Sequence, residues 1–468
     1  MRLEIKTPDS QPSRQGFTIV ELLIVIVIIG ILAAITVVAY TGINQQAGVV
    51  GLKSDLKNAS TQLSIAKIKT GTYPSDDSGI KKSESTDFQY TFTGSDYCLS
   101  ASSSQTGTAA FHIDSTIGTI QDDVCVGHTA PTGGGTGQVD QDTVTTLAGQ
   151  EGEFGFANGN GGAAIFNDPY GIAVDTSGNV YVSDAGNQVI RKITPSGDVT
   201  TLAGSVGNPG STNGTGTNAR FNGPRGVAVD LAGNVYVSDA GNHLIRKIAS
   251  SGVVTTFAGS VGVNGFANGT GTSAVFNGPD GIAVDASGNV YVADMYNHAI
   301  RKISSSQVVT TLAGSIGNSG FANGTGSGAQ FSYPYGVAVD SSGNVYVADF
   351  DNELIRKVTS SGAVTTLAGT LGVNGSANGT GTAASFNDPN GIGVDSLGVV
   401  YVADSQNALI RKITTGGVVS TLTGSAGWGY SDGVVANAMF RYPTGVAIDP
   451  TGRIYIADRF NSVIRKIE

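Results

Sequence analysis

Short apolar runs separated by polar turns recur throughout the second part of the chain. The pattern is clearest in the stretch PYGIAVDTSGNVYVSDAGNQVIRKI, residues 169–193, which returns five more times with few changes. Each copy carries a marker aspartate, and the copies follow at a pitch of 55 residues that drops to 54 at the last step: Asp175, Asp230, Asp285, Asp340, Asp395 and Asp449. A period of this length predicts stacked or radially arranged units.

Each copy contains four runs with the length and composition of β-strands. GIAVD and GNVYVSD are rich in Val, Ile and Tyr, and the D-x-x-G-N turn between them suits a hairpin with its glycine in a left-handed conformation. VIRKI predicts a third strand, and VTTLAG, for example Val199 to Gly204, predicts a fourth. Four strands per repeat are typical of the blade of a β-propeller.

The two ends of the repeat region complement each other. The first VTTLAG-like run, Val144 to Gly149, precedes any GIAVD, whereas the last IRKI ends at Ile467 with no fourth strand after it. We therefore expect the strand from Val144 to be the outer strand of the last blade, which joins the ends into a ring of six blades. Closure of this kind removes two exposed sheet edges.

At these residues the chain resembles the NHL-repeat β-propellers, and the second copy contains Asn242-His243-Leu244 directly before IRKI. The resemblance extends over all six copies and implies a six-bladed propeller over residues 143–468. Known relatives include binding modules and a few enzymes, so the fold leaves the function open.

The start of the chain has a different pattern. Residues 1–16 are polar, and an apolar stretch follows from Gly16 to Tyr40 with Glu21 as its only charge. This stretch is long enough to span a bilayer. A secretory signal peptide would have a shorter apolar core and a small-residue cleavage site, without a carboxylate at its start. A carboxylate beside a hydrocarbon core is costly, which indicates a functional reason for Glu21.

This N-terminal block resembles a type IV prepilin. The resemblance implies a prepilin peptidase that cuts after Gly16 and methylates the new amine of Phe17. It also implies that Glu21 pairs with the amine of a neighbouring subunit during filament assembly, so that the expected partners are other pilin subunits. The membrane would be contacted through residues 17–40, with the basic leader inside the cell and the remainder exported.

The segment between these two regions predicts a small pilin-like head. Apolar residues recur near helical spacing to about Thr70, so we expect one transmembrane and filament helix over 17–70. Short alternating runs then predict a small α+β head over 71–126, and a Gly/Thr-rich stretch over 127–142 has the composition of a linker. The leader is residues 1–16.

The two cysteines of the chain, Cys98 and Cys125, both lie in the predicted head. Because an exported segment lies where disulfides persist, we predict that they pair. Two free thiols are the alternative, and a metal site needs more ligands than two cysteines offer.

Composition excludes one class of partner. The 468 residues include 68 glycines, which reflect many turns, and carry a net charge of −10 with a pI near 4.9. A nucleic-acid-binding protein needs a basic face for phosphates, so no nucleic-acid partner is expected.

Comparison of the six copies separates scaffold from candidate recognition residues. Positions constant in every copy, including the aspartates that begin with Asp184 and the IRK arginines that begin with Arg191, are assigned to the scaffold as Asp–Arg pairs or turns rather than to a calcium ring. Asn-Gly turns explain the N-G-T sequences at Asn213, Asn268, Asn323 and Asn378, and glycosylation of these sequences on an exported surface is the alternative.

Positions that vary between constant neighbours are the better candidates for a ligand face, and they should lie together at one end of the propeller. The first set, within P-x-G, is Tyr170, Arg225, Asp280, Tyr335, Asn390 and Thr444. The second set follows the constant aspartate and includes Met295, Tyr296, Phe350, Asp351, Arg459 and Phe460. The third set follows the constant asparagine and includes Gln188, His243, His298 and Glu353. Aromatic and mixed charged residues suit a surface carbohydrate or a protein ligand. Variation on a solvated surface without a ligand is the alternative.

Candidates for catalysis are few. His243 and His298, with Asp280 or Glu353, approximate a zinc site, but the two histidines occupy the position that is structural in the family they resemble. We therefore expect no catalytic residue, no metal and no cofactor. The sequence predicts a minor or tip type IV pilin-like subunit, in the cytoplasmic membrane and then in an extracellular filament, that displays a propeller for adhesion or ligand binding. The alternatives are a pseudopilin of a secretion or DNA-uptake system and a membrane-tethered propeller lyase or hydrolase.

Overall fold

The computed structural model describes residues 86–92, 97–103, 111–114, 142–425 and 427–468. The chain separates into two compact units, Met1–Val139 and Asp140–Glu468. The predicted leader, the helix over 17–70 and residues 115–141, which contain nearly all of the predicted linker, lie outside the described residues. Within the described residues there is no helix long and apolar enough to cross a bilayer.

The described part of the first unit is a small antiparallel sheet in the order β1-β2-β3. Its strands are β1 (Thr86–Phe92), β2 (Tyr97–Ser103) and β3 (Phe111–Asp114). Cys98 lies in β2, opposite Thr91 and Asp114. Cys125 lies outside the described residues, so the disulfide stays a prediction.

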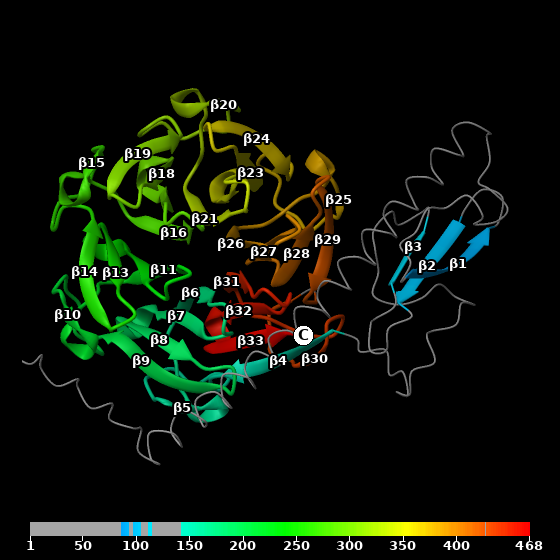
Figure 1. Cartoon of the computed structure of the whole chain (residues 1–468), viewed down its shortest axis with the longest axis horizontal. Coiled ribbons are helices and arrows are strands. Elements are labelled where there is room, and N and C mark those ends of the chain that lie inside the picture. Colours follow the sequence, from blue (N-terminus) through cyan, green and yellow to red (C-terminus); the bar gives the residue numbers. More distant parts are fainter. Residues whose placement is uncertain (1–85, 93–96, 104–110, 115–141, 426) are drawn as a thin grey trace, which may run out of the picture. The chain divides into compact units, whose positions relative to one another are not determined.

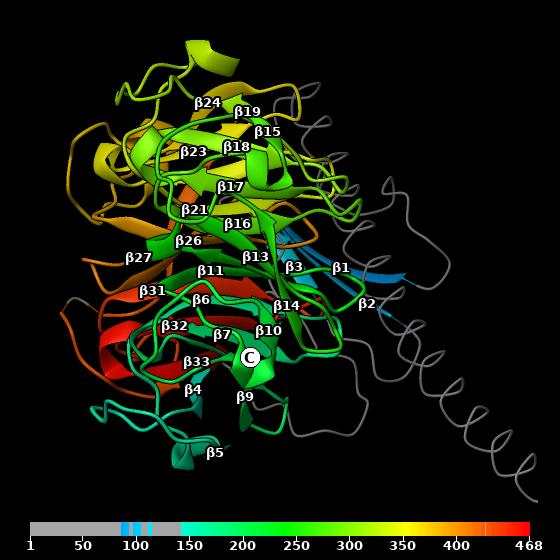
Figure 2. The same cartoon turned by 90° about the vertical axis from the view of Figure 1, so that its left-hand side faces the viewer.

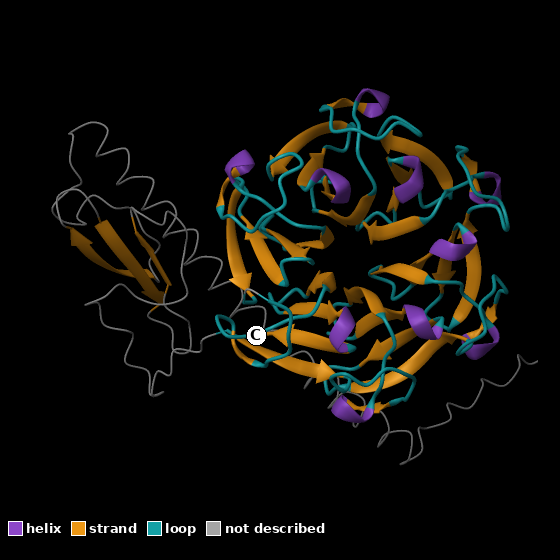
Figure 3. Ribbon diagram, turned by 180° about the vertical axis from the view of Figure 1, so that it is seen from behind, coloured by secondary structure: helices purple, strands orange, loops and turns teal. Residues whose placement is uncertain are grey.

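The second unit is a six-bladed β-propeller whose blades surround a central axis (Figures 1 and 3). The innermost strands are β6 (Pro169–Val174), β11 (Pro224–Val229), β16 (Pro279–Val284), β21 (Pro334–Val339), β26 (Pro389–Val394) and β31 (Pro443–Ile448). The second strands are β7 (Val180–Asp184), β12 (Val235–Asp239), β17 (Val290–Asp294), β22 (Val345–Asp349), β27 (Val400–Asp404) and β32 (Ile454–Asp458). The third strands are β8 (Val189–Ile193), β13 (Leu244–Ile248), β18 (Ala299–Ile303), β23 (Leu354–Val358), β28 (Leu409–Ile413) and β33 (Val463–Ile467).

The fourth strand of each blade follows the predicted VTTLAG run. These strands are β9 (Asp198–Gly204), β14 (Val253–Ala258), β19 (Val308–Ala313), β24 (Ala363–Ala368), β29 (Val418–Thr423) and, for the last blade, β4 (Thr143–Ala148). The sixth sheet has the order β30-β4-β33-β32-β31, so a strand from the start of the repeat region completes the blade made by its end. The predicted ring closure is confirmed.

The prediction of four strands per blade is wrong, because each sheet has five. The additional strands are two residues long: β5 (Gly159–Asn160), β10 (Gly214–Thr215), β15 (Gly269–Thr270), β20 (Gly324–Thr325), β25 (Gly379–Thr380) and β30 (Gly433–Val434). Each pairs with the start of a fourth strand, as Gly159 does with Val199. A two-residue segment carries no periodic apolar pattern, and it covers part of an otherwise open blade edge.

Both faces of the second strands are buried because every blade packs between two neighbours. Val180 and Val182 of β7 belong to the core shared with the sixth blade, whereas Tyr181 between them belongs to the core shared with the second blade. Six such cores fill the six blade junctions, including that between the last and first blades. This arrangement explains why VYV lacks the apolar-polar alternation of a sheet with one solvated face.

The constant aspartates and arginines form one buried ion pair within each blade. In the first blade Arg191 Nη1 lies 2.7 Å from Asp184 Oδ2, and both side chains have zero exposure. The five equivalents are Asp239–Arg246, Asp294–Arg301, Asp349–Arg356, Asp404–Arg411 and Asp458–Arg465. The prediction of scaffold Asp–Arg pairs is confirmed.

Candidate functional site

The variable positions gather at one end of the central channel. Pro169, which starts β6, pairs with Asp184, which ends β7, so the P-x-G residue and the turn after the aspartate lie at the same end of the blade. Short 3-10 helices form most of these turns: η2 (Ala185–Asn187), η4 (Ala240–Asn242), η6 (Met295–Asn297), η8 (Phe350–Asn352) and η10 (Arg459–Asn461). We call this end, with the P-x-G residues and these turns, the variable face. Figure 2 shows the propeller from the side.

At the centre of the variable face, four of the six P-x-G side chains are buried. These are Tyr170, Asp280, Asn390 and Thr444, whereas Arg225 and Tyr335 are partly exposed. The inner strands approach so closely that a Cβ on Gly171 would lie 2.2 Å from the carbonyl oxygen of Arg225. Glycine at this position therefore draws the P-x-G side chains together at the axis.

These central side chains interact across the channel. Arg225 forms an ion pair with Asp280, and its guanidinium lies 5.4 Å from the centre of the Tyr170 ring. Asn390 Nδ2 donates to the Tyr170 hydroxyl at 3.4 Å. Because residues from the first, second, third and fifth blades take part, the cluster binds opposite sides of the ring together. We call it the channel cluster.

Burial dominates the electrostatics of the channel cluster. It raises the pKa of Asp280, an effect that the Arg225 guanidinium opposes, and it raises the pKa of Tyr170 well above its usual value. The carboxylate of Asp280 in turn raises the pKa of Arg225. A paired, buried carboxylate of this kind serves structure as readily as recognition.

The residues after the constant asparagines link neighbouring blades. His243 Nδ1 accepts the backbone N–H of Gly278 at 2.9 Å, and His298 Nδ1 accepts that of Tyr333 at 3.2 Å. Gln188 and Glu353 accept equivalent bonds at their own junctions. Burial lowers the pKa of both histidines and raises that of Glu353 to about 7. Each histidine is thus placed at a blade junction, and the described residues contain no cluster of three metal-binding side chains.

Aromatic side chains on the variable face are confined to some of the blades. One group joins Tyr296, His298 and Tyr333, and beside it Tyr335 lies 4.3 Å from Phe350 between ring centres. A second group consists of Trp428, Tyr442 and Phe460. In the first and second blades the turns carry Ala185, Gly186, Ala240 and Gly241 instead. The face is therefore chemically asymmetric.

Sequence reasoning missed Trp428 and Tyr442. The residue before each inner-strand proline has a positive φ, and at Tyr333 and Tyr442 the values are 46° and 55°. The other copies place Gly or Asp at this position, which suits the left-handed region better than a bulky side chain does. Tyr442 could have been found because a bulky residue stands at a turn position where four other copies have Gly or Asp. Trp428 could have been found because the sequence around it differs from the equivalent segment of the other copies.

The N-G-T asparagines have a structural role that the turn interpretation only partly anticipated. Asn213 Oδ1 accepts a 2.8 Å hydrogen bond from Nη2 of the buried Arg246. Asn158 and Asp432 do the same for Arg191 and Arg465 in copies that lack the threonine. A side-chain oxygen at this position, from asparagine in five copies and from Asp432 in the last, therefore accepts a hydrogen bond from the buried arginine in every copy, with or without an N-x-T sequence.

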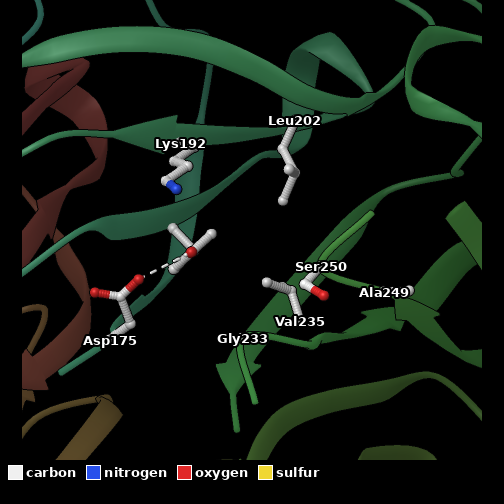
Figure 4. A pocket seen from close by; sticks show the side chains of 8 residues that line it. Asp175, Lys192, Leu202, Gly233, Val235, Ala249 and Ser250 are labelled. Carbon is white, nitrogen blue, oxygen red and sulfur yellow. Dashed lines mark hydrogen bonds between the residues drawn. The ribbon is translucent and has the colours of Figure 1, made fainter. Parts of the chain in front are cut away.

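The opposite face of the propeller contains a cavity of about 240 Å³ between the first and second blades. Figure 4 shows Asp175, Lys192 and Ser250 among the side chains that line it. Tyr181 donates to Asp175 at 3.0 Å, and Lys192 lies 5.6 Å from the Tyr181 ring centre. All these polar groups belong to turn and strand positions that recur in the other copies, which assigns the cavity to the scaffold.

Comparisons with known proteins agree with this architecture. The description "Prokaryotic N-terminal methylation motif" matches residues 11–37, and "NHL repeat" matches 166–193, 221–248, 276–303, 331–358, 386–413 and 440–466. The protein SUPPRESSOR OF QUENCHING 1 of Arabidopsis thaliana is 31% identical over 318 residues, which cover 64% of this chain and 30% of that protein. NHL repeat-containing protein 2 of Bos taurus is 28% identical over 340 residues, which cover 64% of this chain and 46% of that protein. The chain therefore spans less than half of the length of either relative.

A solved structure supports the fold. A protein of unknown function from Bacteroides thetaiotaomicron is similar with a TM-score of 0.55 at 20% identity, over 81% of this chain and 86% of that one. At this identity the likeness concerns the fold alone. With six repeats matched in the six blades and the motif matched at the N-terminus, this chain is an NHL-repeat β-propeller protein with a prokaryotic N-terminal methylation motif.

Proposed function

We propose that the chain is a type IV pilin-like subunit, minor or at the tip of a filament, that displays its propeller at the cell surface to bind a ligand. A prepilin peptidase cleaves after Gly16 and methylates Phe17, and Glu21 then pairs with the amine of a neighbouring subunit. Residues 17–40 hold the chain in the cytoplasmic membrane before assembly. A disulfide between Cys98 and Cys125 closes the head.

One observation carries this proposal: a chain that begins with the methylation motif ends in a closed propeller with an asymmetric variable face. The scaffold accepts different side chains at these otherwise repeated positions, which leaves them available for recognition. Here the turn of the third blade carries the exposed Tyr296, where the first and second blades carry Gly186 and Gly241. Such differences on a rigid scaffold are a common arrangement for recognition.

The candidate ligands are surface carbohydrates and proteins. Exposed aromatic rings with polar groups at their edges suit both. The net charge of −10 opposes a polyphosphate partner. We propose no enzymatic activity, because the histidines of the variable face accept backbone hydrogen bonds at blade junctions.

The test is electron microscopy of sheared surface filaments from the native cell, combined with mass spectrometry of the N-terminus of the subunit. We expect filaments that contain the chain with a methylated Phe17. A Gly16 substitution should leave the chain uncleaved in the membrane fraction, whereas Glu21→Ala should permit cleavage and impair assembly. A wild-type chain that retains Met1 in the membrane would overturn the pilin proposal. Short filaments that stay within the envelope would instead indicate a pseudopilin.

A further inference from the structure

The second aromatic group forms a corner at the edge of the variable face. The ring centres of Tyr442 and Phe460 are 5.1 Å apart with the planes at 23°, so these two rings stack. Trp428 stands beside them at 6.3 Å from each, inclined at 81° to Tyr442 and 66° to Phe460. Its side chain is 47% exposed. We call these three residues the aromatic corner.

Contacts with the fold hold the aromatic corner in place. The indole Nε1 of Trp428 donates to the backbone oxygen of Gln406 at 3.2 Å, which fixes the ring edge while much of the side chain faces solvent. Burial, and after it the nearby carboxylate of Asp388 in the neighbouring blade, raises the pKa of Tyr442 to about 12. A ligand would therefore meet ordered rings, which reduces the entropy lost on binding.

Polar groups surround the aromatic corner. Arg459 lies 5.1 Å from the Phe460 ring centre, and its guanidinium forms an ion pair with Asp168 of the first blade. Asp388, which interacts with Tyr442, belongs to the fifth blade. The arrangement thus offers apolar ring faces with carboxylate and guanidinium groups nearby.

The backbone at Tyr442 is an unusual place for an aromatic residue. Its φ of 55° lies in the left-handed region, where tyrosine is disfavoured, whereas two equivalent positions are occupied by Gly223 and Gly278. A bulky residue in a disfavoured conformation costs stability, and such residues cluster at ligand sites. Trp428 occurs only in the last copy, and Phe460 stands where the first two blades have Gly186 and Gly241 and the third has Tyr296.

From these observations we infer that the aromatic corner binds a hexopyranose ring of a surface oligosaccharide. A pyranose has an apolar C–H face that packs on an aromatic ring and hydroxyl groups around its edge. Carboxylates accept from these hydroxyls, and a guanidinium donates to them. The guanidinium of Arg459 already pairs with Asp168, which disfavours an anionic ligand that would need the same charge. This inference rests on the proposed surface display and names the ligand of that face.

The chain contains its own probe, because Trp428 is its single tryptophan. We would titrate the full chain, purified in a detergent without a sugar headgroup, with hexasaccharides of glucose, mannose, galactose and N-acetylglucosamine, and record the tryptophan fluorescence. We expect a saturable change with at least one of these sugars. A sugar concentration of about 10 mM is enough to detect binding with a Kd of about 1 mM. If the fluorescence does not change with any of the sugars at this concentration, the inference is overturned.

Matched variants separate binding from folding. Phe460→Gln introduces the residue that the fifth copy of the repeat has at the equivalent position, Gln406. It should weaken binding by about tenfold, since a single aromatic contact contributes up to about 1.4 kcal/mol. Tyr442→Gly relieves the left-handed tyrosine and should also weaken binding. Tyr333→Gly makes the same backbone change outside the aromatic corner and should leave binding unchanged. Circular dichroism melting would verify that each variant is folded.

Two further outcomes contradict the inference. Equal affinities for the wild type, Phe460→Gln and Tyr442→Gly would place the sugar elsewhere, and a fluorescence change with gelatin peptides but with none of the sugars would assign the corner to a protein ligand. These results do not depend on the state of Phe17 or on the presence of filaments. A failure here with methylated filaments present would therefore overturn the sugar ligand alone.

Discussion

His243 in the second blade accepts a 2.9 Å hydrogen bond at Nδ1 from the backbone N–H of Gly278 in the third. A ring nitrogen accepts only when it carries no proton, so this link between blades requires neutral histidine. The same requirement holds for His298 and Tyr333 at the next junction. Two blade junctions are therefore sensitive to acid.

Replacing both histidines by glutamine should make the propeller less sensitive to acid. Burial lowers the pKa of His243 and His298 below 6.5, so their neutral form contributes stability above that pH, and the contribution is lost as the pH falls through the lower folded-state values. Glutamine accepts without titrating, as Gln188 does from Gly223 at 2.6 Å. Melting temperatures between pH 8 and pH 5 should fall further for the wild type than for the double variant. Parallel curves would contradict this link.

Glu353→Gln should have the opposite pH dependence. The pKa of Glu353 is raised from 4.5 to about 7, chiefly by burial, so the folded state favours its protonated form. Its contribution to stability is complete below about pH 4.5 and is lost as the pH rises through 7. The variant should melt close to the wild type at pH 4.5 and above it at pH 8. Equal melting temperatures of the wild type and the variant at pH 8 would contradict the raised pKa of Glu353, because ionisation of the carboxylate would then cost no stability.

Removing one member of a buried pair should destabilise the propeller strongly. Arg191→Ala leaves the buried carboxylate of Asp184 without its cation and also removes the hydrogen bond of 2.6 Å to the backbone oxygen of Ala157. We expect the free energy of unfolding, measured with urea, to fall by about 3–5 kcal/mol. Arg453→Ala is the control: its side chain is 50% exposed and pairs with Glu468, so the change should be below about 1 kcal/mol. Similar losses for the two variants would contradict the assigned roles.

Deleting the closing strand should open the ring. A chain that begins after Gly149 lacks β4, which pairs with β33 and also carries β30 at the outer edge of the sixth blade. The exposed edge of β33 favours pairing between molecules. Light scattering after size-exclusion chromatography should show oligomers for this truncation and monomers for one that begins at residue 141. Monomers of equal stability from both truncations would show that closure is dispensable.

Much of the fold follows from local pattern. The repeated runs predict the first four strands of every blade, because strands that pack between neighbouring blades need continuous apolar residues such as Val180, Tyr181 and Val182. The constant Asp184 and Arg191 indicate an ion pair for a similar reason: a scaffold feature must recur wherever the scaffold does. Ring closure through the strand Thr143–Ala148 also follows from the sequence. The last copy lacks a fourth strand, and the first VTTLAG-like run precedes the first copy.

The remaining features depend on contacts that no local pattern records. Gly159 and Asn160 form a strand only because the edge of β9 lies beside them. The tertiary fold also decided that Tyr170 and Asp280 lie buried across the channel, although their positions vary like surface residues. It brought Trp428, Tyr442 and Phe460 from separate loops of the chain into one corner. The sequence by itself determined the repeated strands and the ion pair of each blade. The closed ring determined which of the non-repeated side chains lie together, because residues distant in the chain become neighbours only when the blades are in place.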